Sequence, residues 1–130
     1  MAGRHVVLVG LMGAGKTTVG RALAGLLGRP LVDNDAQIVS ATGATVADIS
    51  AAAGVAEMRR LESAALTAAL ASPEPAVITA AAGTVLDADV RHRLAAPFVV
   101  WLRARPATVA GRVGHDPARP LLGDDPLPVL

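Results

Sequence analysis

The segment 10–17, Gly-Leu-Met-Gly-Ala-Gly-Lys-Thr, has the residue types and spacing of a loop that binds phosphate groups. Its glycines let the backbone approach a ligand closely, and the start of a following helix favours an anion. Lys16 can neutralise the terminal phosphates, and the Thr17 hydroxyl can bind Mg²⁺. Lys16 is the only lysine of the chain, which argues against a chance glycine-rich turn. The predicted nucleotide-binding residues here are Gly13, Ala14, Gly15, Lys16, Thr17 and Thr18.

Alternating strands and helices are predicted around this loop. Apolar runs predict strands at residues 5–9, 30–32, 76–79 and 98–102. Helical patterns cover residues 17–27, 45–53, 57–70, 87–94 and 106–112. This alternation predicts an α/β fold with a parallel sheet and helices on both faces. Because the strands are continuous apolar runs, we expect all four to be fully buried.

The composition limits the function classes. A chain of 130 residues with net charge +1 predicts one domain without a basic surface for nucleic acid. Phe98 and Trp101 are the only aromatic residues, too few for base stacking. There is no cysteine, and the three histidines lack metal-ligand spacing. With no apolar run of about 18 residues and no room for a signal peptide, we expect a cytoplasmic monomer. Its partner would be a small molecule, with no nucleic acid and no membrane.

Two carboxylates, Asp33 and Asp35, follow the second predicted strand. Ligands of open α/β sheets bind outside the carboxyl ends of the strands. The pair could therefore hold Mg²⁺-bound water or act on a substrate hydroxyl. The alternative is a solvated turn with a helix cap. The position after a phosphate-binding loop favours the first interpretation.

Arg59 and Arg60 are predicted in the first turn of the helix at 57–70, where positive charge opposes the helix dipole. Arg59 could bind a carboxylate through two hydrogen bonds. Glu62, three residues later, could steady it. The alternative is an ordinary solvated helix face.

The segment from Gly114 onward is rich in Pro, Gly and Asp and predicts a mobile loop, placed at 113–126. Arg112 and Arg119 bracket it. Arginines on such a loop suit the clamping of phosphates when the loop closes as a lid. Ordinary loop charge is the alternative.

Together these segments resemble the shikimate kinase family, small P-loop kinases of the pathway to aromatic amino acids. The similarity runs from Val6 to about Leu122 and follows the family's order through segments 10–21, 32–35, 45–50, 59–62 and 119–122. The loop alone is shared by many NTPases, whereas the ordered set is specific. The resemblance implies a three-layer P-loop NTPase fold with strand order 2-3-1-4-5. It also implies transfer of the γ-phosphoryl group of ATP, with Mg²⁺, to the 3-hydroxyl of shikimate.

The resemblance implies residue roles as well. Asp35 would accept hydrogen bonds from substrate hydroxyls, and Arg59 would pair with the shikimate carboxylate. Asp33 would orient the water shell of Mg²⁺ beside Thr17. The remaining implied roles are catalysis for Lys16 and Arg119, adenine packing for Arg112, phosphate binding for Arg119, and substrate binding for Ala82 and Gly83.

Several positions depart from the family pattern. Three consecutive glycines of the family are Ala81-Ala82-Gly83 here, and an alanine with positive φ would be strained by about 1–2 kcal/mol. The Gly-Glu pair of the family is Gly54-Val55, and its phenylalanine is Met58.

We expect one P-loop kinase domain over residues 1–130 that is C-terminally incomplete. The last strand, last helix and late substrate-binding arginine of the family are missing, so the fourth strand would expose apolar surface. Turnover by this chain alone would then be very slow. Two alternatives remain open: a catalytically impaired or truncated nucleotide-binding homologue, and another small-molecule kinase such as a gluconate kinase.

Overall fold

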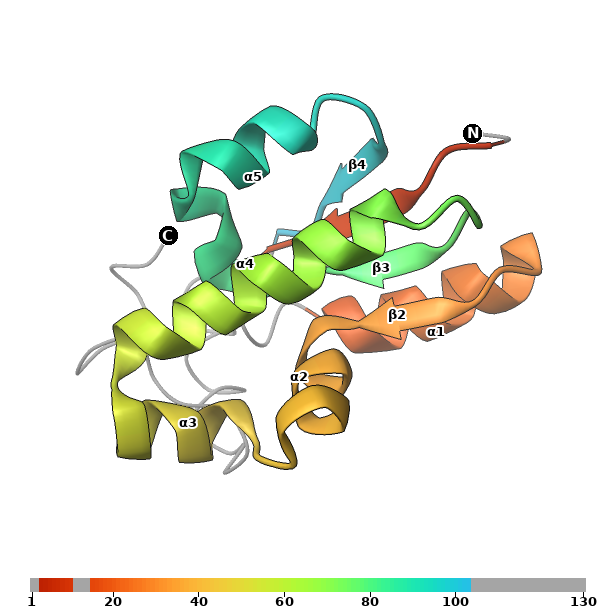
Figure 1. Ribbon diagram of the computed structural model, residues 1–130. Helices are drawn as coiled ribbons and strands as arrows, with labels where there is room; N and C mark the ends of the chain where they lie inside the picture. The colour runs from red at the N-terminus through yellow and green to blue at the C-terminus, as the bar shows by residue number, and fades with distance from the viewer. Residues whose placement is uncertain (1–2, 11–14, 104–130) are drawn as a thin grey trace.

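The sheet is built around β1 (Val6–Val9), whose four residues are all buried. The computed structural model describes residues 3–10 and 15–103. β1 pairs in parallel with β3 (Val77–Thr79) on one side and with β4 (Phe98–Trp101) on the other, and β2 (Leu31–Asp33) pairs with β3. The resulting order, β2-β3-β1-β4, confirms the first four positions of the predicted order (Figure 1).

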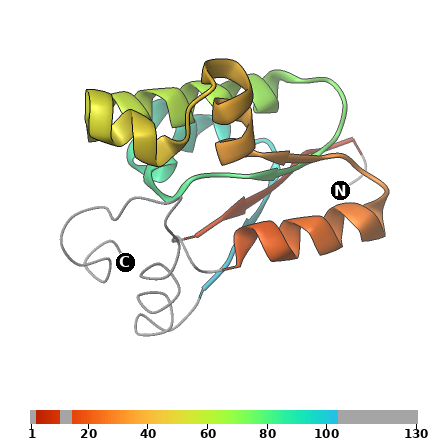
Figure 2. The ribbon, with the colours of Figure 1, turned by 90° about the horizontal axis from the view of Figure 1, so that it is seen from below.

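Helices cover both faces of this sheet. Figure 2 shows α1 (Lys16–Leu27) on one face and α4 (Val55–Ala71) and α5 (Ala88–Arg93) on the other. The short helices α2 (Asn34–Thr42) and α3 (Val46–Ala53) lie beside α4. A 3₁₀ turn, η1 (Ala82–Leu86), connects β3 to α5. None of the helices in the described ranges is long and apolar enough to cross a bilayer.

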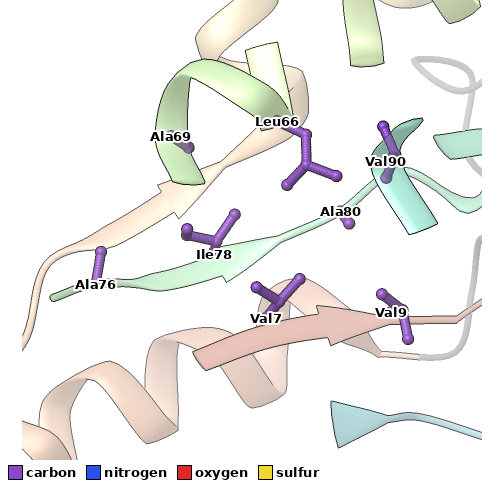
Figure 3. Close-up of a cluster of buried hydrophobic side chains, with 8 residues drawn as sticks. All are labelled: Val7, Val9, Leu66, Ala69, Ala76, Ile78, Ala80 and Val90. Atoms are coloured by element: carbon purple, nitrogen blue, oxygen red, sulfur yellow. The ribbon is translucent and has the colours of Figure 1, made fainter. Parts of the chain in front are cut away.

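The two faces of β1 explain why its sequence is continuously apolar. Val7 and Val9 pack with side chains of β3, α4 and α5 in one buried cluster (Figure 3). Val6 and Leu8 point the other way and pack against α1. Because successive strand residues alternate between faces, a strand covered on both sides needs apolar residues at every position.

The expectation that all four strands are fully buried is wrong for β2 and β4. The β2 residues are half-buried, and in β4 the exposed fractions are 44% for Phe98, 37% for Val99 and 57% for Trp101. Within the described residues both strands lie at the edges of the sheet, where fewer neighbours cover them. The expected apolar exposure of the fourth strand is confirmed.

The helix boundaries follow their capping residues. Thr45 and Asp48 form a capping box at the start of α3, and Asp87 caps α5, so both helices begin within one residue of the predicted start. α2 was not predicted, because its sequence shows little apolar periodicity. It begins after Asp33, whose side chain accepts a hydrogen bond from the Ala36 N–H. The helix predicted at 106–112 and the lid at 113–126 lie outside the described residues.

Close packing of α1 on the sheet depends on Gly20. A Cβ atom at this position would lie 3.0 Å from Leu31 Cδ1, 3.1 Å from Thr79 Cγ2 and 3.4 Å from Leu8 Cδ1. Gly25, in the same helix, has no atom within 4 Å of the same point. Replacing Gly20 by alanine therefore changes both packing and helix propensity, whereas replacing Gly25 changes helix propensity alone.

We predict that Gly20→Ala lowers the free energy of unfolding by about 1–3 kcal/mol, because overpacking outweighs the gain in helix propensity. Gly25→Ala should raise it by up to about 1 kcal/mol. Urea unfolding followed by circular dichroism measures both. Equal stability of the two variants would contradict this account of the α1 contact.

Candidate active site

A pocket of about 490 Å³, including the space at its open mouth, lies at the carboxyl ends of β2 and β3. Lys16 and Thr17 enter it from α1, and Glu62 enters from α4. Its remaining lining residues are Asp33, Asn34, Asp35, Val46, Met58 and residues 79–83. Of the predicted site residues, the pocket brings together Lys16, Thr17, Asp33, Asp35, Ala82 and Gly83, whereas Gly15 and Arg59 do not line it. Thr18, by contrast, is exposed on α1.

The phosphate end of the pocket is the N-terminus of α1. Lys16 is 6% exposed, and its Nζ donates a hydrogen bond to the Gly10 carbonyl at 2.6 Å. Gly15, the N-cap, has φ of 92°, a left-handed conformation that favours glycine. The described residues give α1 no side-chain cap and no acidic residue in its first turn, which suits an incoming anion. Gly13, Ala14, Arg112 and Arg119 lie outside the described residues.

Asp33 links the phosphate end to the sheet. One oxygen, Oδ1, accepts a hydrogen bond from Thr79 Oγ1 at 2.6 Å and lies 3.5 Å from Thr17 Oγ1. The other oxygen, Oδ2, accepts from the Ala36 N–H at 3.1 Å. The carboxylate is thus fixed by contacts to α1, α2 and β3. Sequence reasoning missed Thr79, although a polar residue that ends an apolar strand was the available signal.

The donor set around Thr17 fits Mg²⁺. Among the described residues, no group of three or more His, Cys, Asp or Glu side chains could hold a metal alone. Mg²⁺ is usually bound through one or two protein oxygens, with water and substrate phosphates completing the shell. The Thr17 hydroxyl and the nearby Asp33 carboxylate supply that partial set.

Arg59 does not line the pocket but lies beside it, against the lining residue Gly83. It is the fifth residue of α4, so its placement in the first turn is wrong, and the helix dipole does not explain it. Cγ, Cδ and Nε of Arg59 lie beside Gly83. Its Nε is buried without a hydrogen-bond partner in the described part of the chain. Arg60 instead forms an exposed ion pair with Glu57.

Glu62 is a buried carboxyl group, 6% exposed, at the centre of these charges. Burial, and to a smaller extent the charge of Asp35, raise its pKa from 4.5 to about 7, against the opposing effects of the Arg59 and Lys16 charges. The expected steadying of Arg59 does not occur through a hydrogen bond, since the described residues give Arg59 none. The two side chains are coupled through their charges.

Two amide side chains hold α2 against α4. Asn34 Nδ2 donates to the Glu62 carbonyl at 3.0 Å, and Gln37 Nε2 donates to the Ala65 carbonyl at 3.2 Å. The spacing of three residues on each helix aligns the two bonds. This contact fixes Asp35, on α2, relative to Glu62 and Arg59, on α4.

The departures from the family pattern have simple structural outcomes. No non-glycine residue in the described ranges has positive φ, and Ala81 has φ of −63°, so the strain considered for alanine at 81 or 82 does not arise. Met58 is 2% exposed and packs with Ile38, Val46 and Ile49, where it forms part of the pocket wall.

The glycine-rich sequence between β1 and α1 is followed in the chain by β2, which lies two strands away from β1 in the sheet and ends in Asp33. This arrangement defines the class of P-loop kinases. The family model described as shikimate kinase matches residues 12–128. A shikimate kinase from Thermobifida fusca is 48% identical over 120 residues, which cover 92% of this chain and 69% of that protein. The chain belongs to the shikimate kinase family.

Solved structures agree with this assignment. A shikimate kinase from Acinetobacter baumannii, in complex with shikimate, superposes with a TM-score of 0.86 at 36% identity. The match covers 98% of this chain and 72% of that one. A gluconokinase from Sinorhizobium meliloti has a TM-score of 0.66 at 24% identity, which reflects the shared fold alone.

The buried Glu62 carboxyl predicts a pH-dependent stability difference. The folded state holds this proton up to about pH 7, whereas the unfolded chain releases it near 4.5. Stability is therefore lost as pH rises through this window and is constant above it, with a total of about 3 kcal/mol. Relative to wild type, Glu62→Gln should gain stability over the same range.

Urea unfolding at pH 5 and pH 8 measures this difference. Glu74→Gln, at an exposed turn position, is the matched control and should show no such trend. A Glu62→Gln difference that is the same at both pH values would contradict the assignment of a raised pKa.

Proposed function

We propose that this pocket transfers the γ-phosphoryl group of ATP to the 3-hydroxyl of shikimate, with Mg²⁺ bound at Thr17 and Asp33. The observation that carries the proposal is the joining, in one pocket, of a buried lysine at a helix N-terminus with Asp35 and Glu62. Arg59 lies beside it against Gly83. One end is suited to phosphates and the other to a hydroxylated acid.

At the nucleotide end, the ammonium group of Lys16 neutralises phosphate charge, and the N–H groups of α1 donate to phosphate oxygens. The Thr17 hydroxyl and the Asp33 carboxylate would hold Mg²⁺ at this end of the pocket. The ion would supply neutralisation of the charge on the phosphate oxygens. Thr79 and Ala36 keep the Asp33 carboxylate in place for this task.

At the acceptor end, the guanidinium of Arg59 binds the carboxylate of shikimate through charge-assisted hydrogen bonds. Asp35 accepts a hydrogen bond from the reacting hydroxyl and orients its oxygen. The backbone at Ala82 and Gly83 borders the ring. The hydrogen bonds of Asn34 and Gln37 join α2 to α4. They therefore fix the distance between Asp35, which binds the hydroxyl of shikimate, and Arg59, which binds its carboxylate.

During transfer, a bond forms between the 3-hydroxyl oxygen and the γ-phosphorus as the bond to the bridging oxygen of ADP breaks. The hydroxyl proton moves to the Asp35 carboxylate. Products are ADP and the phosphate ester. The chain residues therefore contribute position and charge rather than a covalent intermediate.

We also propose a cytoplasmic monomer in which residues 1–130 form one kinase domain. Its composition supports this, with net charge +1, no cysteine and few aromatic residues. In this proposal Arg112 would contact adenine, and Arg119 would close on the phosphates.

In the chain extended to the length of the relatives it matches, we predict that Asp35→Asn lowers kcat by about 10²–10⁴-fold with little change in KM for ATP, because a carboxylate on the reacting hydroxyl acts in the transition state. Arg59→Ala should raise KM for shikimate by about 30- to 1,000-fold, because it binds a carboxylate present throughout. Arg60→Ala, which removes only the exposed pair with Glu57, is the matched control.

An assay coupled to ADP release, with ATP and shikimate each varied, measures these constants. In the chain extended to the length of the relatives it matches, ADP release that shikimate does not accelerate would reject the proposed function. If Asp35→Asn changed KM for ATP and KM for shikimate equally, the role assigned to Asp35 would be rejected.

A further inference from the structure

Gly83 is the only glycine of the 81–83 segment. Unlike a glycine that a turn requires for its positive φ, it is a buried residue with an ordinary backbone conformation. It is buried in η1, and its φ lies outside the left-handed region. Its backbone conformation is therefore open to any residue. The reason for glycine at this position must be space.

The space at Gly83 is filled by Arg59. A Cβ atom at position 83 would lie 3.3 Å from Arg59 Nε, 3.6 Å from Cγ and 3.7 Å from Cδ. Three consecutive atoms of the arginine side chain thus run along the bare backbone of η1. Among the described residues, Arg59 supplies the three atoms nearest to this point.

This contact is what orients Arg59. Its Nε is buried and has no hydrogen-bond partner in the described part of the chain, so no bond to Nε holds the side chain. The adjacent Arg60 provides a contrast, because two of its nitrogen atoms bind the Glu57 carboxylate. For Arg59, packing against Gly83 replaces such a pair and leaves the guanidinium for a ligand.

We propose that Gly83 is a positioning residue, whose missing side chain sets the direction of the Arg59 guanidinium toward the acid acceptor. This inference rests on the proposed function, in which Arg59 binds the carboxylate of shikimate. It also accounts for the alanines at 81 and 82. Both already carry methyl groups in unstrained conformations, so the requirement for glycine applies to position 83.

An added methyl group at position 83 would act on Arg59 rather than on the fold. A distance of 3.3 Å is shorter than ordinary carbon–nitrogen packing, so one partner must shift. The long arginine side chain can rotate away, whereas η1 is held by the Thr84 hydroxyl bonded to the Ala81 carbonyl. Gly83→Ala should therefore leave the chain folded and misdirect the guanidinium.

Kinetics and binding of shikimate test this proposal in a double-mutant cycle with Arg59→Ala. Gly83→Ala should raise both KM and the calorimetric Kd for shikimate about tenfold or more, with kcat and the ATP constant nearly unchanged. In the Arg59→Ala background, Gly83→Ala should add nothing. Gly25→Ala, where a Cβ meets no atom within 4 Å, is the matched control.

A second readout does not need shikimate. In protein labelled with ¹⁵N-arginine, the Nε–H signal of Arg59 is identified by its loss in Arg59→Ala. Its exchange with solvent should be slow in wild type and in Gly25→Ala, and markedly faster in Gly83→Ala. If Gly83→Ala unfolds while the double variant folds, the clash with Arg59 is likewise established.

Two results would overturn the proposal. One is that the Arg59 Nε–H exchanges with solvent at the wild-type rate in Gly83→Ala. The other is that Gly83→Ala weakens shikimate binding in the Arg59→Ala background as much as it does in wild type. Unfolding of both Gly83→Ala and the double variant would also overturn it, because Gly83 would then serve the fold alone. A wild-type chain that neither binds nor phosphorylates shikimate would reject the proposed function, and the Nε–H exchange would still decide the role of Gly83.

Discussion

The carboxylate of Asp33 is the constraint on which the site depends. It ends β2, caps α2, accepts a hydrogen bond from Thr79 on β3 and lies beside Thr17 on α1. Each of these contacts is modest alone, since a net hydrogen bond contributes about 1 kcal/mol. Together they fix where the phosphate-binding helix begins relative to the sheet and where α2 starts. Asp35, two residues further, inherits its position from the same arrangement.

The acceptor end is assembled differently, from groups that are incompletely satisfied. Asn34 Oδ1 and Arg59 Nε are buried without hydrogen-bond partners among the described residues. Burial and the charge of Asp35 also raise the pKa of Glu62 to about 7. Such features lower the stability of the free protein, and they gather where a polar acid would supply partners. The hydrophobic clusters around β1 provide the stability that tolerates them.

The sequence predicted the elements whose physics is local. The strand positions and the starts of α3 and α5 follow from residue type and spacing, whereas the order of the strands was implied by the family resemblance. It failed where tertiary surroundings decide. β2 and β4 are apolar but lie at the edges of the sheet, and the sequence of α2 has little apolar periodicity. The Asp33–Thr79 contact joins residues 46 positions apart. The position of Arg59 depended on a helix start at Val55 that no capping side chain marks.

In the proposed function, the charge of Asp33 couples the fold to Mg²⁺-bound nucleotide. Calorimetric titration of ADP, with and without Mg²⁺, into wild type and Asp33→Asn tests it most directly. Asparagine at position 33 keeps an oxygen that can accept a hydrogen bond from Thr79 or Ala36, but it lacks the negative charge. The control is Asp48→Asn, which makes the same change at the cap of α3. The account predicts similar metal-free affinities and loss of most of the gain from Mg²⁺, about tenfold or more, in Asp33→Asn. An undiminished Mg²⁺ gain in Asp33→Asn would contradict it.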